Sequence, residues 1–336
     1  MTKYSIILPV RNGGTLVKAC VHSILSQTYA GFNFLVLDNN SNDGTLEWIR
    51  SLNDERIIIY PAKESLGIEG NWGRIKDLSK NEFITLIGHD DILDPHYLSV
   101  MDELISKYPD AGLYQSHFRY IDSTGNTIRA CKPMKEKQAP SEVLANFLSM
   151  QTDVMGTGFM MRSKDYDALG GIPLYPKLLF ADLELWINLT KKSYMAVAAQ
   201  ECFAFRIHQS TTTTSSDEVM LGAFEQFTRF LKRLGTDDPA FDKVIKEHAG
   251  SILNFYCQGL TSRLLRTPMK KRKGQTVQAV INHFNSYADS LLPAGTFKPL
   301  DNFTVRMALF VDSNFITRNL FLLFKKVYAK PVVANK

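Results

Sequence analysis

The sequence predicts an α/β protein in which a mostly parallel sheet is flanked by helices. Over about the first 110 residues, short β-rich runs alternate with segments of helical spacing, which is typical of βαβ units. The runs are apolar on both faces, as expected for strands that helices cover on each side. We expect strands at 4–10, 32–37, 56–60 and 82–87, and helices at 16–27, 45–52, 70–79 and 95–107.

The pattern changes after residue 111. Two alternating runs around the turn at 123–126 predict a hairpin, and a third strand is expected at 156–161. Helices are expected at 164–169 and 180–192, and the pattern is helical from about residue 216 to the end. The sequence therefore predicts a domain over residues 1–215, built from halves at 1–110 and 111–215, followed by a helical extension over 216–336.

The composition is that of a globular protein with a substantial core, since 45% of the 336 residues are hydrophobic and 22% are charged. Four widely spaced cysteines without a C-x-x-C pair favour a reducing, intracellular compartment over a disulfide framework. The first residues enter a strand directly, so no secretory signal is expected. No apolar run approaches the roughly 20 residues of a membrane-spanning helix. We therefore expect a cytoplasmic protein.

The net charge of +5 is modest, but six basic residues gather between positions 263 and 273. This cluster suits an anionic lipid surface, and it equally suits a solvated loop between helices. No aromatic interleaving or nucleic-acid motif accompanies the cluster, so nucleic acid is not an expected partner.

The apolar strand at 82–87 ends in two adjacent carboxylates, Asp90 and Asp91. Acidic residues often cap helices, but Asp94 already fills that role here. Mg²⁺ and Mn²⁺ take carboxylate oxygens together with substrate phosphates. Polar clusters also follow two earlier strands, and parallel strands place all three ends on one edge of the sheet. The sequence therefore predicts a metal and sugar-nucleotide site there, which includes Pro9, Val10, Arg11, Asn12, Asp38 and Asn39.

Three of the candidate sites each admit two interpretations. Asp38 and Asn39 either form a plain βα turn or bind a base or ribose. Asp182 either favours the first turn of a helix electrostatically or acts as a general base toward an acceptor hydroxyl. Arg206 and His208 share one face of an extended segment, which suits a diphosphate and its metal, although a lone histidine is more often structural.

The order of these motifs resembles the inverting family 2 glycosyltransferases, which have the GT-A fold. The resemblance spans about residues 1–215 and is highly specific. The stretches that carry it are Ser5–Gly13, Ser23–Tyr29, Leu37–Thr45, Gly70-Asn71-Trp72, His89–Pro95, Gly170-Gly171, Asp182–Trp186 and Arg206-Ile207-His208.

The resemblance implies a role for each candidate residue. Asp91 would bind Mg²⁺ or Mn²⁺ and Asp182 would be the catalytic base. Arg206 and His208 would close over the metal and diphosphate, with His208 near the metal. The nucleotide-sugar pocket would be lined by Pro9, Val10, Arg11, Asn12, Asp38, Asn39, Asn71, Arg74 and Asp90.

Three positions depart from the commoner family pattern. Asn39 stands where an aspartate usually contacts the base, Gly88 where a third acidic residue often stands, and Ala181 where many members have glutamate. The identity of the nucleotide stays open because an asparagine offers donors as well as acceptors.

The expected activity is transfer of a sugar from a nucleoside-diphosphate sugar to a hydroxyl of a glycan or lipid-linked acceptor, with inversion, in surface polysaccharide synthesis. The helical extension, with its amphipathic stretch 303–328, would dock on the inner face of the plasma membrane or on a partner. The alternative is a non-catalytic scaffold subunit that binds sugar nucleotides. An oxidoreductase is disfavoured because no G-x-G-x-x-G follows the first strand.

Overall fold

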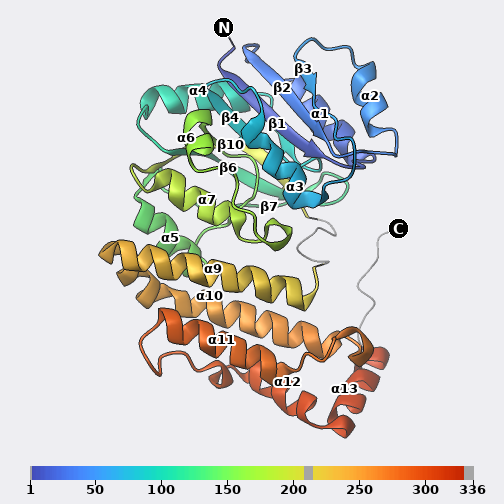
Figure 1. Ribbon diagram of the computed structural model, residues 1–336, viewed down its shortest axis with the longest axis vertical. Helices are drawn as coiled ribbons and strands as arrows, with labels where there is room; N and C mark the ends of the chain where they lie inside the picture. The colour runs from blue at the N-terminus through green and yellow to red at the C-terminus, as the bar shows by residue number, and fades with distance from the viewer. Residues whose placement is uncertain (1, 208–214, 329–336) are drawn as a thin grey trace. The chain divides into compact units, whose positions relative to one another are not determined.

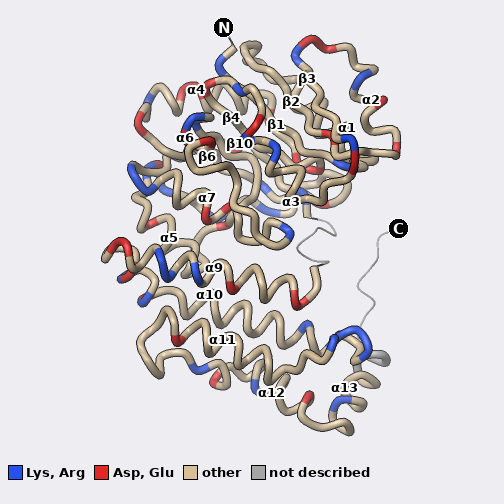
Figure 2. Tube along the Cα trace, viewed as in Figure 1, with Lys and Arg blue, Asp and Glu red and all other residues tan. Residues whose placement is uncertain are grey.

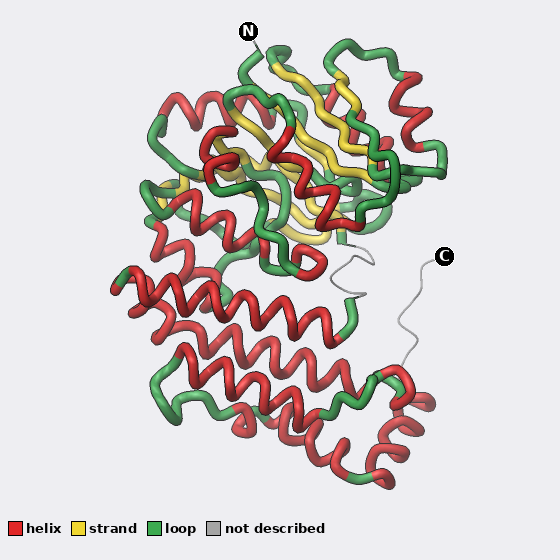
Figure 3. Tube along the Cα trace, viewed as in Figure 1, coloured by secondary structure: helices red, strands yellow, loops and turns green. Residues whose placement is uncertain are grey.

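A computed structural model describes residues 2–207 and 215–328, which form two compact units (Figure 1). The first unit comprises Met1–Phe147, Gln151–Ser215 and Gly222–Phe227. The second comprises Leu148–Met150, Ser216–Leu221 and Thr228–Lys336. Within the described residues the strands belong to the first unit, and the second unit is helical (Figure 3).

The first unit is built on one sheet, whose described strands follow the order β3-β2-β1-β4-β9-β6-β10-β5, with β7 beside β6 and β8 beside β10. Neighbouring strands from β3 to β4 are parallel, whereas β9 runs antiparallel to both β4 and β6. The strands are β1 Tyr4–Val10, β2 Phe32–Asp38, β3 Ile57–Ile59, β4 Phe83–Leu86, β5 Ile92–Leu93, β6 Leu113–Ile121, β7 Thr127–Ala130, β8 Lys137–Gln138, β9 Met160–Arg162 and β10 Met195–Arg206.

Helices of this unit pack on the sheet through apolar stripes. In α1 the residues Val17, Cys20, Val21 and Ile24 are buried, at the spacing that places them on one helical face. Alternate side chains of β1 and β2 join them in a continuous core. The described helices are α1 Leu16–Leu25, α2 Thr45–Ser51, α3 Gly67–Gly73, α4 Tyr97–Lys107, α5 Pro140–Leu148, α6 Ser163–Ala168 and α7 Ala181–Thr190, with the short 3₁₀ turns η1 Arg74–Asp77 and η2 Pro176–Leu178.

The four parallel strands predicted from the first 110 residues are confirmed. The later strand differs from the prediction, since it begins at Met160 instead of residue 156. The residues before it turn back over the sheet, with Gly158 donating its N–H to Leu86 O at 2.9 Å. Helix α4 begins two residues later than predicted because Asp94 Oδ1 accepts the His96 N–H at 3.0 Å and forms a turn ahead of the helix.

The second unit consists of α9 Asp217–Asp237, α10 Pro239–Arg266, α11 Val277–Leu291, α12 Phe303–Ser313 and α13 Phe315–Tyr328, with the 3₁₀ turns η3 Met269–Lys271 and η4 Pro299–Asp301. Side chains cap the first four of these helices at their N-termini, as the Asn302 carboxamide does for α12 by accepting the Thr304 N–H at 2.9 Å. The helical extension predicted from residue 216 is therefore present.

Gly112 lies where the chain enters β6, and a Cβ there would stand 2.0 Å from the backbone oxygen of Leu189. We expect Gly112→Ala to lower the free energy of unfolding by roughly 3 kcal/mol, because backbone atoms must separate to admit the methyl group. Gly259→Ala in α10 is the matched control, since nothing lies within 4 Å of its Cβ position. The control should be neutral or slightly stabilising, and chemical denaturation measures both variants. Equal effects of the two substitutions would contradict the crowding argument.

Candidate functional site

The carboxyl ends of β1 and β2 lie side by side, and the loops after them are fastened together. The two strands are in register, with Val10 opposite Asp38, and Asn39 donates its N–H to Val10 O at 2.8 Å. Asn12 adopts the left-handed region with φ 50° and accepts the Asn42 N–H on Oδ1 at 2.9 Å. The polar segments 9–12 and 38–39, predicted to meet at this edge, are thus brought together.

Asp43 strengthens this junction from the second loop. Its Oδ1 accepts the Thr45 N–H and its Oδ2 accepts the Gly14 N–H, each at 3.0 Å. Asp43 therefore holds both the start of α2 and the loop after β1 in place.

Asp38 presents a buried acceptor at the end of β2. Its side chain is 1% exposed, and Oδ2 accepts the Ser41 N–H at 3.2 Å. Within the described residues, Oδ1 has no hydrogen-bond partner. An unsatisfied buried acceptor costs about 1–3 kcal/mol, so this oxygen is suited to receive an N–H or O–H from a ligand.

The neighbouring Asn39 is occupied by the protein backbone. Its Nδ2 donates to Gly67 O at 3.1 Å and its Oδ1 accepts the Leu66 N–H at 2.9 Å. The side chain thus fixes the turn that leads into α3, and it borders the predicted nucleotide pocket as a scaffold.

Asn71 and Arg74, also predicted to line that pocket, brace the ends of the strands. Asn71 Nδ2 donates to Leu37 O at 3.1 Å, and its Oδ1 accepts from Arg74 Nη1 at 3.0 Å. Arg74 Nη2 donates to Tyr60 O at 2.7 Å. Partial burial lowers the pKa of Arg74, with nearby Asp38 opposing that shift. The guanidinium therefore places positive charge near the Asp38 carboxylate.

The acidic pair follows β4, and Asp91 is its buried member. Asp91 is 2% exposed; its Oδ2 accepts the Thr157 hydroxyl at 2.7 Å and its Oδ1 accepts the Arg206 N–H at 3.1 Å. Burial, and then the charge of Asp90, raise the pKa of Asp91 to about 8 despite these two donors. An additional positive charge is what would stabilise the ionised form here.

Arg206 holds the acidic turn from β10. Its side chain is 4% exposed, and the guanidinium donates to Asp90 O and to Asp122 O, each at 2.8 Å. The predicted diphosphate contact of Arg206 therefore competes with bonds to two backbone carbonyls. His208, the other predicted residue of this segment, lies outside the described residues.

The space over Gly88 shows how well the acidic pair suits a cation. A Cβ at Gly88 would lie 2.7 Å from Asp90 Oδ1 and 3.0 Å from Asp91 Oδ2. Oxygens of both carboxylates therefore border the cradle that the missing side chain leaves, and hard oxygen ligands suit Mg²⁺ or Mn²⁺. The described residues contain no group of three or more His, Cys, Asp or Glu that could hold a metal, so Asp90 and Asp91 are the described ligand candidates. The glycine at position 88 thus leaves both carboxylates room that a longer side chain would reduce.

Asp182 stands in the first turn of α7, as predicted. The preceding Phe180 has φ 69°, and Asp182 Oδ1 accepts the Leu183 N–H at 3.0 Å. Burial raises the pKa of Asp182 to about 6, in spite of hydrogen bonds that favour the ionised form. Its Oδ2 would lie 3.8 Å from a Cβ on Gly156. A carboxyl whose pKa lies near neutrality is suited to accept a proton.

The segment 156–158 joins the two carboxylates, and sequence analysis did not identify it. Gly156 borders Asp182, and the next residue, Thr157, donates to Asp91. Gly158 has φ +76°, and a Cβ there would stand 2.6 Å from the Phe203 ring. The Gly-Thr-Gly run was the available signal, because flanking glycines allow this tight passage between β4 and β10.

Thr157→Val should weaken Mn²⁺ binding about tenfold to a hundredfold, because a donor that orients a metal-binding carboxylate is lost. Isothermal titration of the metal into the protein measures this. Thr261→Val in α10 is the matched control, since Thr261 is also buried and its hydroxyl donates to Cys257 O at 2.8 Å. Unchanged Mn²⁺ affinity in Thr157→Val would contradict the role of Thr157.

Asp182→Asn should raise the free energy of unfolding at pH 8 by on the order of 1–2 kcal/mol, and the melting temperature should rise with it. The folded-state pKa of about 6 lies above the ordinary aspartate pKa of 3.8. The carboxyl therefore favours folding below pH 3.8 and loses that contribution as pH rises through 6. The stabilisation should therefore vanish by about pH 4. Asp43→Asn is expected to change stability in the opposite direction at pH 8, because hydrogen bonds lower the pKa of Asp43 despite its desolvation.

Known proteins resemble the chain in sequence and in fold. The pattern described as Glycosyl transferase family 2 matches residues 5–170. The Escherichia coli enzyme UDP-Glc:alpha-D-GlcNAc-diphosphoundecaprenol beta-1,3-glucosyltransferase WfgD is 24% identical over 213 residues, which cover 63% of this chain and 79% of that one. The GalNAc(5)-diNAcBac-PP-undecaprenol beta-1,3-glucosyltransferase of Campylobacter jejuni is 25% identical over 234 residues, covering 66% and 69%.

Two solved structures share the fold. S. aureus TarS 1-349 in complex with UDP-GlcNAc superposes with a TM-score of 0.66 at 12% identity, covering 96% of this chain and 91% of that one. The Pyrobaculum calidifontis mannosyltransferase PcManGT in complex with GDP-Man and Mn²⁺ gives a TM-score of 0.52 at 14% identity, covering 96% and 88%. The sequence pattern, the glycosyltransferase relatives and the shared GT-A architecture agree, and the chain belongs to the family 2 glycosyltransferases.

Proposed function

We propose that this enzyme transfers a sugar from a nucleoside-diphosphate sugar to a hydroxyl of a lipid-linked glycan, with inversion, in surface polysaccharide synthesis. The observation that carries the proposal is the segment 156–158, in which Thr157 donates to Asp91 and the adjacent Gly156 lies beside Asp182. The relatives from E. coli and C. jejuni, whose names specify undecaprenol-linked acceptors, support a lipid-linked acceptor here. We place the enzyme at the cytoplasmic face of the plasma membrane, where such acceptors are available.

The donor we propose is a uridine-diphosphate sugar. Asp38 Oδ1, which has no partner among the described residues, is suited to accept the imide N–H of uracil. Adenine lacks such an N–H, and guanine carries its ring N–H in a larger base. Arg11 and Asn12, at the edge beside Asp38, would face the ribose and phosphates together with Pro9 and Val10. TarS, crystallised with UDP-GlcNAc, offers a precedent for a uridine donor on this fold.

In the proposed mechanism, Asp91 and Asp90 would hold a Mg²⁺ or Mn²⁺ ion, with His208 as a further candidate ligand. A bound cation would neutralise charge on the departing diphosphate as a Lewis acid. Asp182 takes the proton from the acceptor hydroxyl, which attacks the anomeric carbon opposite the leaving group. Thr157 keeps Asp91 in place, and Arg206 holds the acidic turn by its backbone bonds. The anomeric configuration inverts without a covalent intermediate.

We assign the parts of the chain accordingly. Residues 1–110 bind the nucleotide, residues 111–215 supply the base and the acceptor side, and residues 216–336 form the docking extension. A non-catalytic scaffold subunit is the second candidate, favoured by one observation: Ala181 stands where many family members carry a glutamate beside the base.

A panel of sugar nucleotides, tested for transfer and hydrolysis with and without Mn²⁺, tests the proposal. We expect turnover with a UDP-sugar only in the presence of the metal, at a rate that rises through pH 6 as Asp182 loses its proton. Asp182→Asn should reduce turnover about 10²- to 10⁴-fold while the nucleotide still binds. Asp165→Asn, in α6, is the control and should be fully active, since the Asp165 side chain is 42% exposed. Binding of a donor without any turnover by the unmodified protein would favour the scaffold.

A further inference from the structure

Helices α12 and α13 leave apolar side chains uncovered at helical spacing. On α12 the exposed residues are Phe303, Met307 and Phe310, at positions i, i+4 and i+7. On α13 they are Ile316, Leu320, Leu323 and Phe324, with Phe315 at the bend 82% exposed. Apolar residues gathered in this way mark an interaction surface, whereas single exposed ones would need no explanation.

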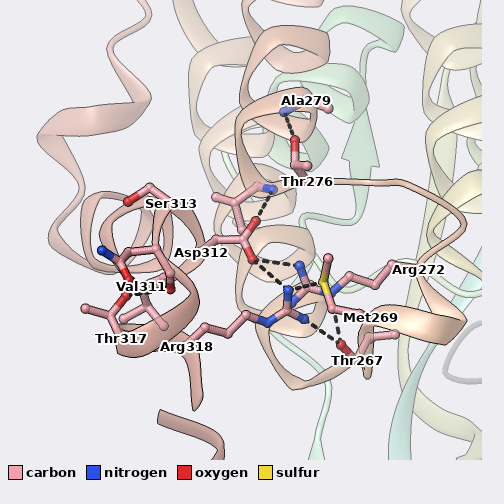
Figure 4. A network of polar contacts seen from close by, with 12 residues as sticks. Thr267, Met269, Arg272, Thr276, Ala279, Val311, Asp312, Ser313, Thr317 and Arg318 are labelled. Atoms are coloured by element: carbon pink, nitrogen blue, oxygen red, sulfur yellow. Dashed lines mark hydrogen bonds and ion pairs between the residues drawn. The ribbon is translucent and has the colours of Figure 1, made fainter. Parts of the chain in front are cut away.

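The bend between these helices is fixed from inside (Figure 4). Asp312, near the end of α12, pairs with Arg272 Nη1 at 2.7 Å and with Arg318 Nη1 of α13 at 3.7 Å, and its Oδ2 accepts the Val277 N–H at 2.9 Å. Arg272 Nε also donates to Thr267 O at 2.9 Å. The arginines are 3% and 6% exposed, so breaking the network would strand buried charge. The apolar faces are therefore held in a set orientation to each other.

The structure divides the basic cluster at 263–273, for which a lipid surface and a solvated loop were both expected. Three of its members form ion pairs within the protein, Arg263 with Asp217, Arg272 with Asp312 and Lys273 with Glu218. Arg266, Lys270 and Lys271 are exposed, and so is Lys273 in spite of its ion pair.

Lys270 and Lys271 lie next to the apolar surface. They belong to η3, whose Met269 is exposed and whose sulfur contacts the Arg318 guanidinium of α13. Figure 2 shows this run of basic residues beside α13. The exposed faces of α12 and α13 thus have a positively charged border on the turn that holds the bend.

We propose that the surface formed by α12, α13 and η3, here named the elbow, docks the enzyme on an anionic lipid bilayer. The apolar faces would enter the boundary between headgroups and acyl chains, with Lys270 and Lys271 at the lipid phosphates. Within the described residues no single helix is long and apolar enough to cross a membrane; the pair α12 and 315–324 passes that test only jointly and bends by 115°. The bend and the basic border favour docking on the surface.

A bilayer is favoured over a second copy of the chain because a symmetric contact through the elbow would bring the lysines of both copies together. The elbow deepens the proposed membrane location without depending on the sugar chemistry. Vesicle binding, measured without donor or acceptor, therefore succeeds or fails independently of the proposed transfer reaction.

The test is flotation of the full chain with vesicles of phosphatidylcholine, with and without phosphatidylglycerol. We expect the unmodified chain to bind the anionic vesicles. The affinity should fall more than about a hundredfold in Leu320→Ser/Leu323→Ser/Phe324→Ser. It should fall roughly 20- to 30-fold in Lys270→Gln/Lys271→Gln. Asn319→Ser, exposed on the same helix, and Lys243→Gln, exposed on α10, are the matched controls and should bind like the unmodified chain.

A labelled variant keeps the test decisive if the triple variant does not fold. The cysteines Cys20, Cys131, Cys202 and Cys257 are all buried, so an environment-sensitive dye attached to Leu320→Cys would report on the elbow. Its emission should shift to the blue with anionic vesicles and not with neutral ones. Equal flotation of the triple variant and the unmodified chain, or no dye shift, would overturn the proposal. Two other results would also overturn it: dimerisation that the triple variant abolishes without vesicle binding, and retention in the bilayer after carbonate extraction.

Discussion

The burial of the Asp91 carboxylate is the constraint on which the site depends. The carboxylate receives one hydrogen bond from Thr157, ahead of β9, and another from the Arg206 backbone in β10. It thereby joins segments that lie 66 and 115 residues away from it along the chain. Burial, and then the charge of Asp90, raise the pKa of Asp91 to about 8, although both hydrogen bonds and the charge of Arg206 favour the ionised form. A bound cation would favour the ionised form further.

In the second unit a buried carboxylate is neutralised in a different way. Asp312 is also an inward-facing carboxylate, with a side chain 6% exposed, but two arginine side chains neutralise it. The charge of Arg206 also favours the ionised form of Asp91, but its guanidinium donates to two backbone carbonyls and forms no ion pair with Asp91. Asp312 thus holds α12 and α13 together through two ion pairs, whereas Asp91 receives its hydrogen bonds from a hydroxyl and a backbone N–H.

The donor side follows the same logic on a smaller scale. Asn39, Asn71 and Arg74 use their polar groups on the backbone around the carboxyl end of β2, whereas Asp38 at that end keeps a buried acceptor without a partner among the described residues. At position 39, where the family commonly has an aspartate, the asparagine bonds the backbone of residues 66 and 67. Base selection would then depend mainly on Asp38.

The sequence alone determined the α/β class, the four parallel strands, the acidic pair at a strand end and Asp182 in the first turn of a helix. These features depend on local periodicity and on which residues follow a strand, and both can be read from residues adjacent in the sequence. The tertiary structure alone decided four other features. Thr157 donates to Asp91, Gly88 leaves room for both carboxylates, and the Arg206 guanidinium bonds two backbone carbonyls. The basic cluster at 263–273 is divided between ion pairs and exposed side chains. These contacts join residues that lie far apart along the chain. Packing and burial select the partners, and the residues adjacent in sequence do not indicate which partner is selected.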